Sequence, residues 1–307
     1  MTAIITRGSA PRLLQDGLRD IFNNQLGMHE SKYDKIFKVS DSRKAFEIDL
    51  QMTGFGRAST KDEGDDITFD TMQQGISPKY LHVTVAKGYI ITEEAQEDDL
   101  YDQYSDGARA LADSLAITRE LDAHSVLNNG FDTGYTMTNG DGLPLFSTAH
   151  LNGGPDGGTY SNRLTIDADL SEASLEDLLI QIMNFTDERG LQRPLMAERL
   201  IAAPANAFNA HRIMKSSLQS GTANNDTNAV KDMGMVKNGV LISPYLTDSD
   251  AWFLTTNHPK GLKFYQRVAP QFGQDNAFTS GNARYKARQR YSYGWSAAAG
   301  IYGSQGA

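Results

Sequence analysis

The sequence contains no cysteine. This absence excludes disulfides, thiolate-bound zinc, iron–sulfur clusters and thiol nucleophiles. Long hydrophobic runs are also missing, because no uncharged apolar stretch reaches the roughly 18 residues that a membrane-spanning helix needs. Residues 1–12 lack the apolar segment of a signal peptide. We therefore expect a protein that is made in the cytoplasm and has no membrane contact.

Motifs with a known catalytic mechanism are absent as well. The sequence has no GxSxG elbow, no GxxxxGK[ST] phosphate loop and no HExxH helix. Gly54-Phe55-Gly56 resembles the start of a dinucleotide-binding turn, but no helix pattern follows it, so it predicts a simple turn. The six histidines form no close pair at ligand spacing. We therefore predict no enzyme activity, no cofactor and no metal site.

Two sets of loop residues contain side chains that could support catalysis. Ser147, His150 and Asp156 contain the residue types of a nucleophilic triad, but a triad is recognised by geometry and their spacing gives no support. His150 is better interpreted as a polar residue at the rim of a glycine-rich loop. Asp141 and Asp156 could supply the carboxylate pair of a hydrolase, which would require pKa tuning that a sequence does not reveal.

Charge is unevenly distributed along the chain. The formal net charge of -9 argues against binding nucleic acid by counterion release. An acidic run at residues 93–99 stands where a helix dipole favours carboxylates, and it could alternatively bind a cation or a neighbour's basic arm. Basic residues alternate with aromatic ones near the end, at Arg284, Lys286, Arg288 and Arg290. For this row we favour ion pairs between subunits over contacts with DNA phosphates.

Hydrophobic periodicity predicts two segments that a single globule does not readily cover. Residues 9–27 form an amphipathic helix whose apolar face needs a partner elsewhere. Residues 46–52 alternate as a half-buried strand, a charged tip follows at 57–66, and alternation resumes over 81–85. The pattern indicates a long hairpin, and an isolated hairpin is only marginally stable in water, so another surface must cover it.

The remaining chain alternates between helices, loops and strands. The longest helical pattern covers residues 97–128, roughly 48 Å at ~1.5 Å per residue. A glycine-rich loop, a helix at 174–189, a strand at 199–203 and a polar loop at 219–232 follow, and a late strand begins at residue 284.

This order of elements resembles that of the major capsid proteins of tailed bacteriophages, the Hong Kong 97 fold. The local sequences at 115–120, 126–131 and 142–150 are similar to those of phage head subunits, including the Mu-like branch. The resemblance implies an α+β fold. Its expected parts are an N-terminal arm (1–45), an extended loop (46–92), a peripheral domain (93–190) with the spine helix 97–128, an axial domain (191–265) and C-terminal strands that return to the peripheral domain (266–307).

The implied function is self-assembly into pentamers and hexamers of an icosahedral head around double-stranded DNA. The implied partners are other copies of the chain, a separate scaffolding protein, a portal and, as a further candidate, a decoration protein; DNA is packaged without sequence-specific binding. The protein would be assembled in the host bacterial cytoplasm and reside in the virion. The expected intersubunit contacts are Phe46, Ile48, Leu50, Gly54, Arg57, Lys61 and Asp65 of the hairpin, Leu14, Leu18 and Phe22 of the arm, and Arg284 and Arg288.

Two alternatives remain open at this point. An encapsulin-like bacterial compartment shares the fold but encloses cargo enzymes. A soluble hydrolase with carboxylates on loops belongs to a different class. Self-crosslinking, known in one branch of the family, is not carried over, because Lys61 lies at the hairpin tip but no partner asparagine can be chosen.

Overall fold

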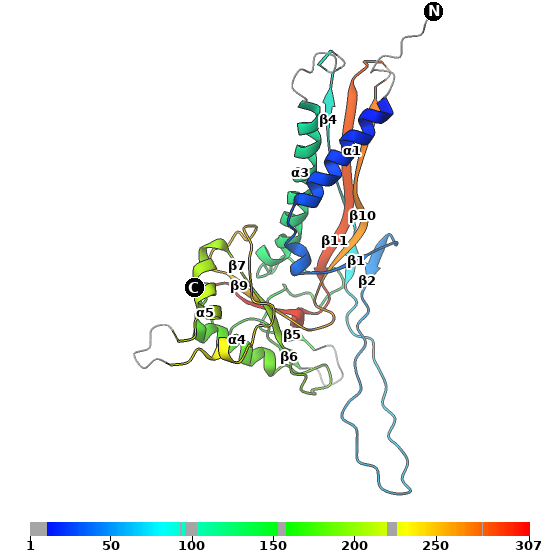
Figure 1. The fold of residues 1–307 in the computed structure, drawn as a ribbon. Helices are drawn as coiled ribbons and strands as arrows, with labels where there is room; N and C mark the ends of the chain where they lie inside the picture. The colour runs from blue at the N-terminus through cyan, green and yellow to red at the C-terminus, as the bar shows by residue number, and fades with distance from the viewer. Residues whose placement is uncertain (1–10, 93, 96–102, 153–157, 220–225, 278) are drawn as a thin grey trace, which may run out of the picture.

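The computed structural model describes residues 11–307 except 93, 96–102, 153–157, 220–225 and 278; for residues 11–16, 103 and 104 it describes the backbone alone. The molecule is elongated (Figure 1), with an upper lobe of long strands and helices, a lower lobe around a second sheet, and a hairpin that runs down beside the lower lobe. No helix among the described residues is long and apolar enough to cross a membrane.

A four-stranded sheet forms the upper lobe. Its strands, from edge to edge, are β1 (Lys38–Asp41), β10 (Leu262–Asn276), β11 (Ala283–Trp295) and β4 (Val83–Ile91). β1 runs parallel to β10, whereas β11 is antiparallel to both of its neighbours. Ala283, Tyr285 and Ala287 of β11 are buried while the residues between them are exposed, so the sheet has one covered and one open face.

Two helices cover the buried face of this sheet: α3 (Gln103–Asn128) and α1 (Pro11–Met28). Ala108, Leu111 and Leu115 of α3 are buried at helical spacing. The described helix begins at Gln103, and the earlier part of the expected spine helix 97–128, with most of the acidic run at 93–99, lies outside the described residues.

The second sheet organises the lower lobe. Its strands, in order, are β12 (Ile301–Ser304), β9 (Trp252–Thr256), β7 (Ala197–Ala202) and β8 (Val240–Ile242). The helices of this lobe are α4 (Glu172–Met183), α5 (Ala207–Lys215) and α6 (Ala229–Asp232), and a short ladder joins β5 (His150–Leu151) to β6 (Thr159–Tyr160). Leu175, Leu178 and Ile182 of α4 are buried in a cluster with Trp252 and Tyr302.

Three short 3-10 helices complete the described elements: η2 (Tyr33–Lys35), η3 (Pro204–Asn206) and η4 (Ala298–Gly300). The last of these lies where the lobes meet. A Cβ built on Gly300 would stand 2.2 Å from the Cα of Gly261, so the two backbones approach each other at a distance that only glycine permits. The two lobes are therefore closely packed at this point.

The hairpin is shorter as a ladder than the sequence pattern predicts. Only β2 (Phe46–Ile48) and β3 (Lys79–Leu81) pair as strands, and a single bridge joins Met52 to Gln74 farther out. Beyond it the two arms run side by side to the tip (Figure 1). The alternating segment 81–85 spans two strands: Leu81 ends β3 and pairs with Phe46 in the hairpin, whereas Val83 and Val85 belong to β4, which pairs with β11 in the upper sheet.

Two further boundaries differ from the expected ones. Helix α4 was expected in the peripheral region 93–190, yet it packs against the lower sheet with Trp252 and Tyr302. The chain end was expected to return to the peripheral domain; β10 and β11 lie in the upper sheet, whereas β12 pairs with β9 in the lower one. Both lobes therefore contain segments that are distant in sequence.

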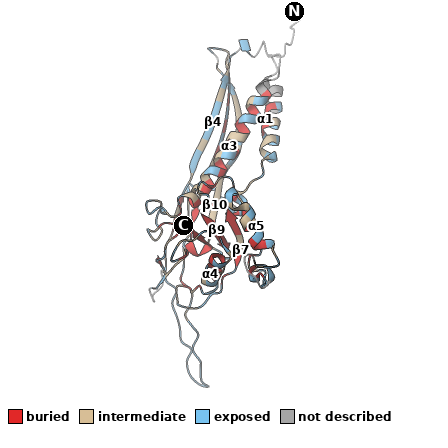
Figure 2. Cartoon of the chain, turned by 90° about the vertical axis from the view of Figure 1, so that its left-hand side faces the viewer, coloured by how far each residue is buried: buried red, intermediate tan, exposed pale blue. Residues whose placement is uncertain are grey.

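Burial follows this architecture. Figure 2 shows buried residues along α3 and at the junction of the lobes, while the hairpin is largely exposed. The largest apolar cluster contains Val126 and Leu127 of α3, Phe253 of the lower sheet and Phe264 and Trp295 of the upper sheet, so one core spans both lobes.

Candidate functional site

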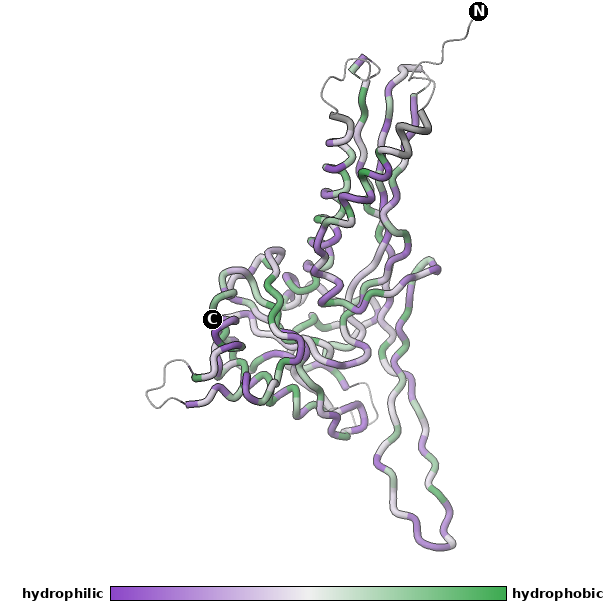
Figure 3. The backbone as a smooth tube through the Cα atoms, in the orientation of Figure 1, coloured by the Kyte–Doolittle hydropathy of each residue, from purple (hydrophilic) through white to green (hydrophobic). Residues whose placement is uncertain are grey.

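The hairpin presents large apolar side chains to solvent. Phe46, Ile48 and Leu50, which the sequence singled out as contacts, are 40%, 50% and 44% exposed, and Phe69 near the tip is 88% exposed. Figure 3 shows hydrophobic and hydrophilic stretches alternating along the hairpin. Soluble monomers seldom expose many apolar residues in one region, so this segment has the character of a binding surface.

Arg189, which the sequence does not single out, fixes the middle of the hairpin to the lower lobe. Its Nε donates to the carbonyl oxygen of Gly54 at 3.0 Å, and its Nη2 donates to the carbonyl oxygen of Thr71 at 2.6 Å. The same Nη2 pairs with Asp70 at 3.2 Å. Gly54 was expected to touch a neighbour, but its carbonyl is held by its own chain. Nothing in the sequence around Arg189 signals this role.

Asp70 links the two arms of the hairpin just beyond the contacts of Arg189. Its carboxylate accepts a hydrogen bond from the backbone N–H of Gly56 at 2.8 Å and one from Thr71 at 2.7 Å. These two bonds, with a smaller effect of Arg189, lower the pKa of Asp70 below its ordinary value. The part of the hairpin from residue 57 to residue 69 therefore projects from a defined point.

The tip carries the charged contact candidates. Arg57, Lys61 and Asp65 are all exposed. Within the described part of the chain, none of the three forms an ion pair with another side chain. The tip charges are thus available to another molecule.

The arm helix α1 packs on its own chain. Leu18 and Phe22 are 2% and 0% exposed and contact α3 and β11, and the ring of Phe22 lies 5.5 Å from that of Phe272. The expectation that this apolar face needs a partner elsewhere is therefore corrected for these two residues, because α3 and the upper sheet cover it. The side chain of Leu14 lies outside the described residues.

A buried carboxylate holds the segment that follows α1. Glu120 of α3 is fully buried and accepts hydrogen bonds from the backbone N–H groups of Lys32 at 2.8 Å and Tyr33 at 3.0 Å. Burial raises the pKa of Glu120, while the two N–H groups and His29 act in the opposite direction. The guanidinium of Arg119 lies 4.9 Å from the ring centre of Tyr33.

His124 extends this buried polar group toward the lower lobe. Its Nδ1 lies 2.7 Å from the carbonyl oxygen of Glu120 and its Nε2 lies 2.8 Å from the hydroxyl of Ser243. Burial lowers the pKa of His124. Glu120 and His124 stand four residues apart on the buried side of the helix, and this spacing was the one sequence signal that could have revealed the group.

The basic row on β11 occupies the open face of the upper sheet, as the alternation predicts. Arg284, Lys286 and Arg288 are exposed and Arg290 is half-buried, whereas Tyr285 and Tyr291 point into the core. Arg288 donates from Nη2 to the Oε1 atom of Gln271 at 3.3 Å. The row therefore offers positive charge on the side of the sheet that α1 and α3 leave uncovered.

The triad hypothesis fails on geometry. His150 is fully buried, with Nδ1 at 2.6 Å from Asp141 and Nε2 at 3.1 Å from the carbonyl oxygen of Leu145, so its interpretation as a loop-rim residue was wrong. Ser147 accepts from the N–H of Ala149 and has no described contact with His150. Asp156 lies outside the described residues, so neither the triad nor the Asp141–Asp156 pair is assembled by the part of the chain that the structure describes.

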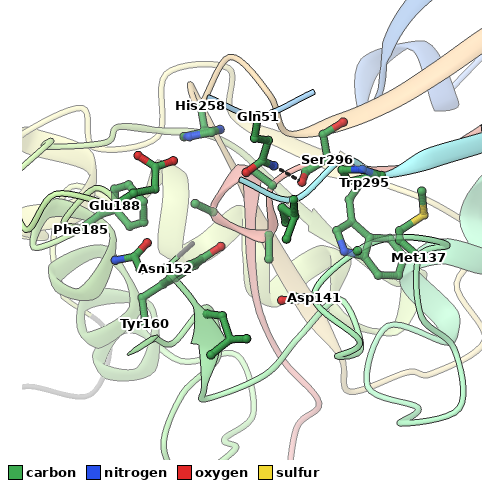
Figure 4. A pocket seen from close by; sticks show the side chains of 17 residues that line it. Gln51, Met137, Asp141, Asn152, Tyr160, Phe185, Glu188, His258, Trp295 and Ser296 are labelled. Atoms are coloured by element: carbon green, nitrogen blue, oxygen red, sulfur yellow. Dashed lines mark hydrogen bonds between the residues drawn. The ribbon is translucent and has the colours of Figure 1, made fainter. Parts of the chain in front are cut away.

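A small cavity of about 40 Å³ lies where the hairpin base meets the lower lobe (Figure 4). Gln51 donates across it to the carbonyl oxygen of Ser296. Burial, with Arg193 and Lys260 adding to it, lowers the pKa of His258 to about 4. The space suffices for a water molecule or two, which suits a packing joint and not a substrate site. Within the described ranges, no group of acidic or histidine side chains could hold a metal ion.

Comparisons with known proteins agree with this architecture. No curated protein sequence matches the chain. Among solved structures, the capsid of a native GTA particle matches with a TM-score of 0.58 at 14% identity, over 90% of this chain and 90% of that one. A virus-like particle from Pyrococcus furiosus matches with a TM-score of 0.57 at 11% identity, over 95% and 99%. Microbacterium phage Oxtober96 gives 0.52 at 10% identity, over 98% of both chains.

At these identities the structures establish the fold, and they confirm the predicted α+β, Hong Kong 97-type architecture. The sequence itself establishes the family, because the model of the family described as phage capsid protein matches residues 77–303, most of the chain. The chain therefore belongs to the phage capsid protein family and is a virion component that associates with copies of itself into a shell.

Proposed function

We propose that the chain is the major subunit of a tailed-phage head, forming pentamers and hexamers of an icosahedral shell around double-stranded DNA, with no enzymatic role. The exposed hairpin carries this proposal. Its base is held by Arg189 of the lower lobe, by Lys260, and by Lys263 at the start of β10 in the upper sheet, so the apolar side chains beyond the base are presented in a defined direction. A copy of the same chain can cover them in a closed symmetric assembly.

The contacts between subunits follow from this arrangement. Phe46, Ile48 and Leu50 would lie against a neighbour together with the tip residues Arg57, Lys61 and Asp65. Gly54 would contribute indirectly, because its carbonyl oxygen accepts the hydrogen bond from Arg189 that holds the hairpin to the lower lobe. The arm would contribute its outer side, because Leu18 and Phe22 face the body of the same chain.

Further partners belong to the same proposal. A separate scaffolding protein and a portal would direct assembly in the host cytoplasm, and a decoration protein could bind the finished shell. Packaged DNA would be enclosed without sequence-specific contacts, which the net charge of -9 supports, because an anionic wall does not adhere to DNA. Membership in the Mu-like branch stays a prediction from the local sequences within residues 115–150.

The encapsulin-like alternative is less favoured than a phage head, because the family that matches most of the chain is that of phage capsid proteins. Gene context separates the two functions. Portal and terminase genes beside this gene support a phage head, whereas an adjacent cargo enzyme would support a compartment.

Electron microscopy of the purified protein, expressed alone and with its neighbouring genes, tests the proposal. We expect shells, tubes or capsomer rings. Small uniform particles under every assembly condition, together with hydrolysis of a panel of substrates, would contradict it and favour the hydrolase.

A further inference from the structure

A pocket of about 200 Å³ opens on the uncovered face of the upper sheet, where β10 departs from regular pairing with β11. The register shifts between Gln266 and Val268 and again between Val268 and Gln271. Such irregularities turn side chains away from their normal alternation. Arg267, from the first shift, joins Arg288 and Arg290 in lining the pocket.

The three guanidinium groups are not neutralised by the described chain. The Nε atoms of Arg267 and Arg290 are buried and have no hydrogen-bond partner, and none of the three arginines forms an ion pair with a described side chain. These charges also affect the nearby His82. Burial lowers the pKa of His82, Arg290 and Arg267 lower it further, and Glu47 acts in the opposite direction.

Unsatisfied buried donors and adjacent like charges both destabilise an isolated subunit. Arginine forks bind planar oxyanions through paired hydrogen bonds, and carboxylates have the matching geometry. The pocket is therefore suited to bind one or two carboxylate groups.

The hairpin tip carries the complementary charge. Its carboxylates are all exposed and have no described cationic partner: Asp62, Glu63, Asp65 and Asp66. In Figure 1 the tip lies at the opposite end of the molecule from the upper sheet, so a chain does not place its own tip in its own pocket. The residues from 49 to 64 span up to about 50 Å, and the hairpin extends past the lower lobe of its own chain (Figure 1).

We infer that the Arg267–Arg288–Arg290 pocket of one subunit receives carboxylates of the hairpin tip of a second copy of this chain. Every chain provides one tip and one pocket at different places on its surface. A contact of this head-to-tail kind closes a ring when successive subunits are related by a closed rotation, as in the pentamers and hexamers of the proposed shell. The inference rests on the proposed assembly and names residues that would hold it together.

The surroundings of the pocket favour a protein segment over a nucleic-acid backbone. The β4 residues opposite the basic row are small or apolar, with Ala86, Gly88 and Ile90 paired to Arg288, Lys286 and Arg284. Ile90 is 61% exposed, and Ile67 and Phe69 beside the acidic tip are 59% and 88% exposed. Docking of the tip would bury apolar side chains on both partners, whereas a phosphate chain would leave them in water.

Charge reversal tests the inference in the full-length protein. R288E/R290E reverses the pocket, D65K/D66K reverses the tip, and a third variant combines all four substitutions. We expect each double variant to lower shell yield about tenfold or more, and the combined variant to return to within about threefold of wild type, because rescue requires the two charges to meet. D177K/D232K changes the net charge as the tip reversal does but alters exposed residues of the lower lobe, and it serves as the control.

The outcomes separate this inference from the proposed function. Absence of shells from the wild-type protein under all conditions contradicts the proposed assembly and the inference with it. Wild-type shells together with normal yield from R288E/R290E overturn the inference alone, as does a combined variant that is no better than either double variant. Normal shells from R288E/R290E with loss of DNA retention in a gel-shift assay would assign the pocket to phosphate instead.

Discussion

Glu120 places a carboxylate inside the contact between α3 and the segment that follows α1. The group is fully buried, and two backbone N–H groups of that segment depend on it. Removing the acceptor would leave both donors unsatisfied away from water, at roughly 1–3 kcal/mol each. This single side chain therefore determines how firmly residues 29–33 are attached to the long helix.

We expect Glu120→Ala to lower the free energy of unfolding of the unassembled subunit by about 3 kcal/mol. Glu120→Gln keeps one acceptor and avoids burying a charge, so its loss should be about 1 kcal/mol. Urea denaturation followed by circular dichroism measures both, with the less buried Glu176→Ala as control. An alanine variant as stable as that control would show that Glu120 does not anchor the segment.

His258 gives the unassembled subunit a dependence on pH. Its Nδ1 accepts a hydrogen bond from the backbone N–H of Lys260 at 3.3 Å, which requires an unprotonated nitrogen. The pKa of His258 is about 4 in the folded chain and 6.5 as a reference for the unfolded chain. A depressed pKa stabilises the fold above pH 6.5, and this contribution is lost as pH falls toward 4, in total about 3 kcal/mol.

Between pH 7 and pH 4 we expect His258→Gln to lose about 2–3 kcal/mol less stability than the wild type. Glutamine keeps an acceptor for Lys260 and does not titrate. Glu120 has the opposite pH dependence. Because burial raises its pKa in the folded chain, its contribution to the free energy of unfolding grows as the pH falls through that raised pKa. Urea unfolding at several pH values measures the difference, and parallel curves for the two proteins would contradict the role of His258.

The sequence predicted the position of single residues where periodicity determines which face of a helix or strand they occupy. Arg284, Lys286 and Arg288 lie on the open face of β11, as their alternation with tyrosines indicates. It did not predict Glu120 or the pair of Asp141 and His150. Those groups are defined by which loop packs on which helix, and a local pattern carries no information on that.

Among the elements, the hairpin contributes least to its own subunit. From residue 57 to residue 66 no side chain is buried, and the last fixed points are Gly54, Gly56 and Asp70. Thr53 and Gln73 hydrogen-bond each other through the backbone and the threonine hydroxyl, so the two arms remain joined below the tip.

We expect deletion of residues 54–66 to leave the melting temperature of the unassembled subunit within a few degrees of the wild-type value while shells fail to form. Replacing residues 57–66 by glycine and serine in equal number keeps the length but removes the charges, so this variant should also fail to form shells if the tip charges hold neighbours together. Calorimetry and electron microscopy measure the two effects. Normal shells from the deletion variant would eliminate the proposed role of the hairpin.

The elements also show where sequence patterns lose their predictive value. Within the alternating residues 81–85, Leu81 pairs with Phe46 on the first arm of the hairpin, but Val83 and Val85 pair with β11, about two hundred residues later in the chain. Alternation specifies which face of a strand is buried but leaves the choice of neighbour open. The same limitation explains why the end of the chain was assigned to one lobe although β12 pairs with β9.

On the scale of the whole molecule, the overall order of arm, hairpin, long helix and late strands was predictable, because each of these has its own length and periodicity. The division into lobes was not. The core around Val126, Phe253 and Trp295 draws on three distant parts of the chain, so a linear list of domain ranges does not describe it.

The position of β11 has a consequence for how the protein is made. This strand is at the centre of the upper sheet, between β10 and β4, although it comes late in the chain. During synthesis, β4 and the apolar side of α3 emerge long before the strand on which they pack, so the upper lobe completes late and through contacts of long sequence separation. A chain cut short before residue 283 would lack that central strand and the arginines of its open face, so prematurely terminated products should be excluded from the growing shell.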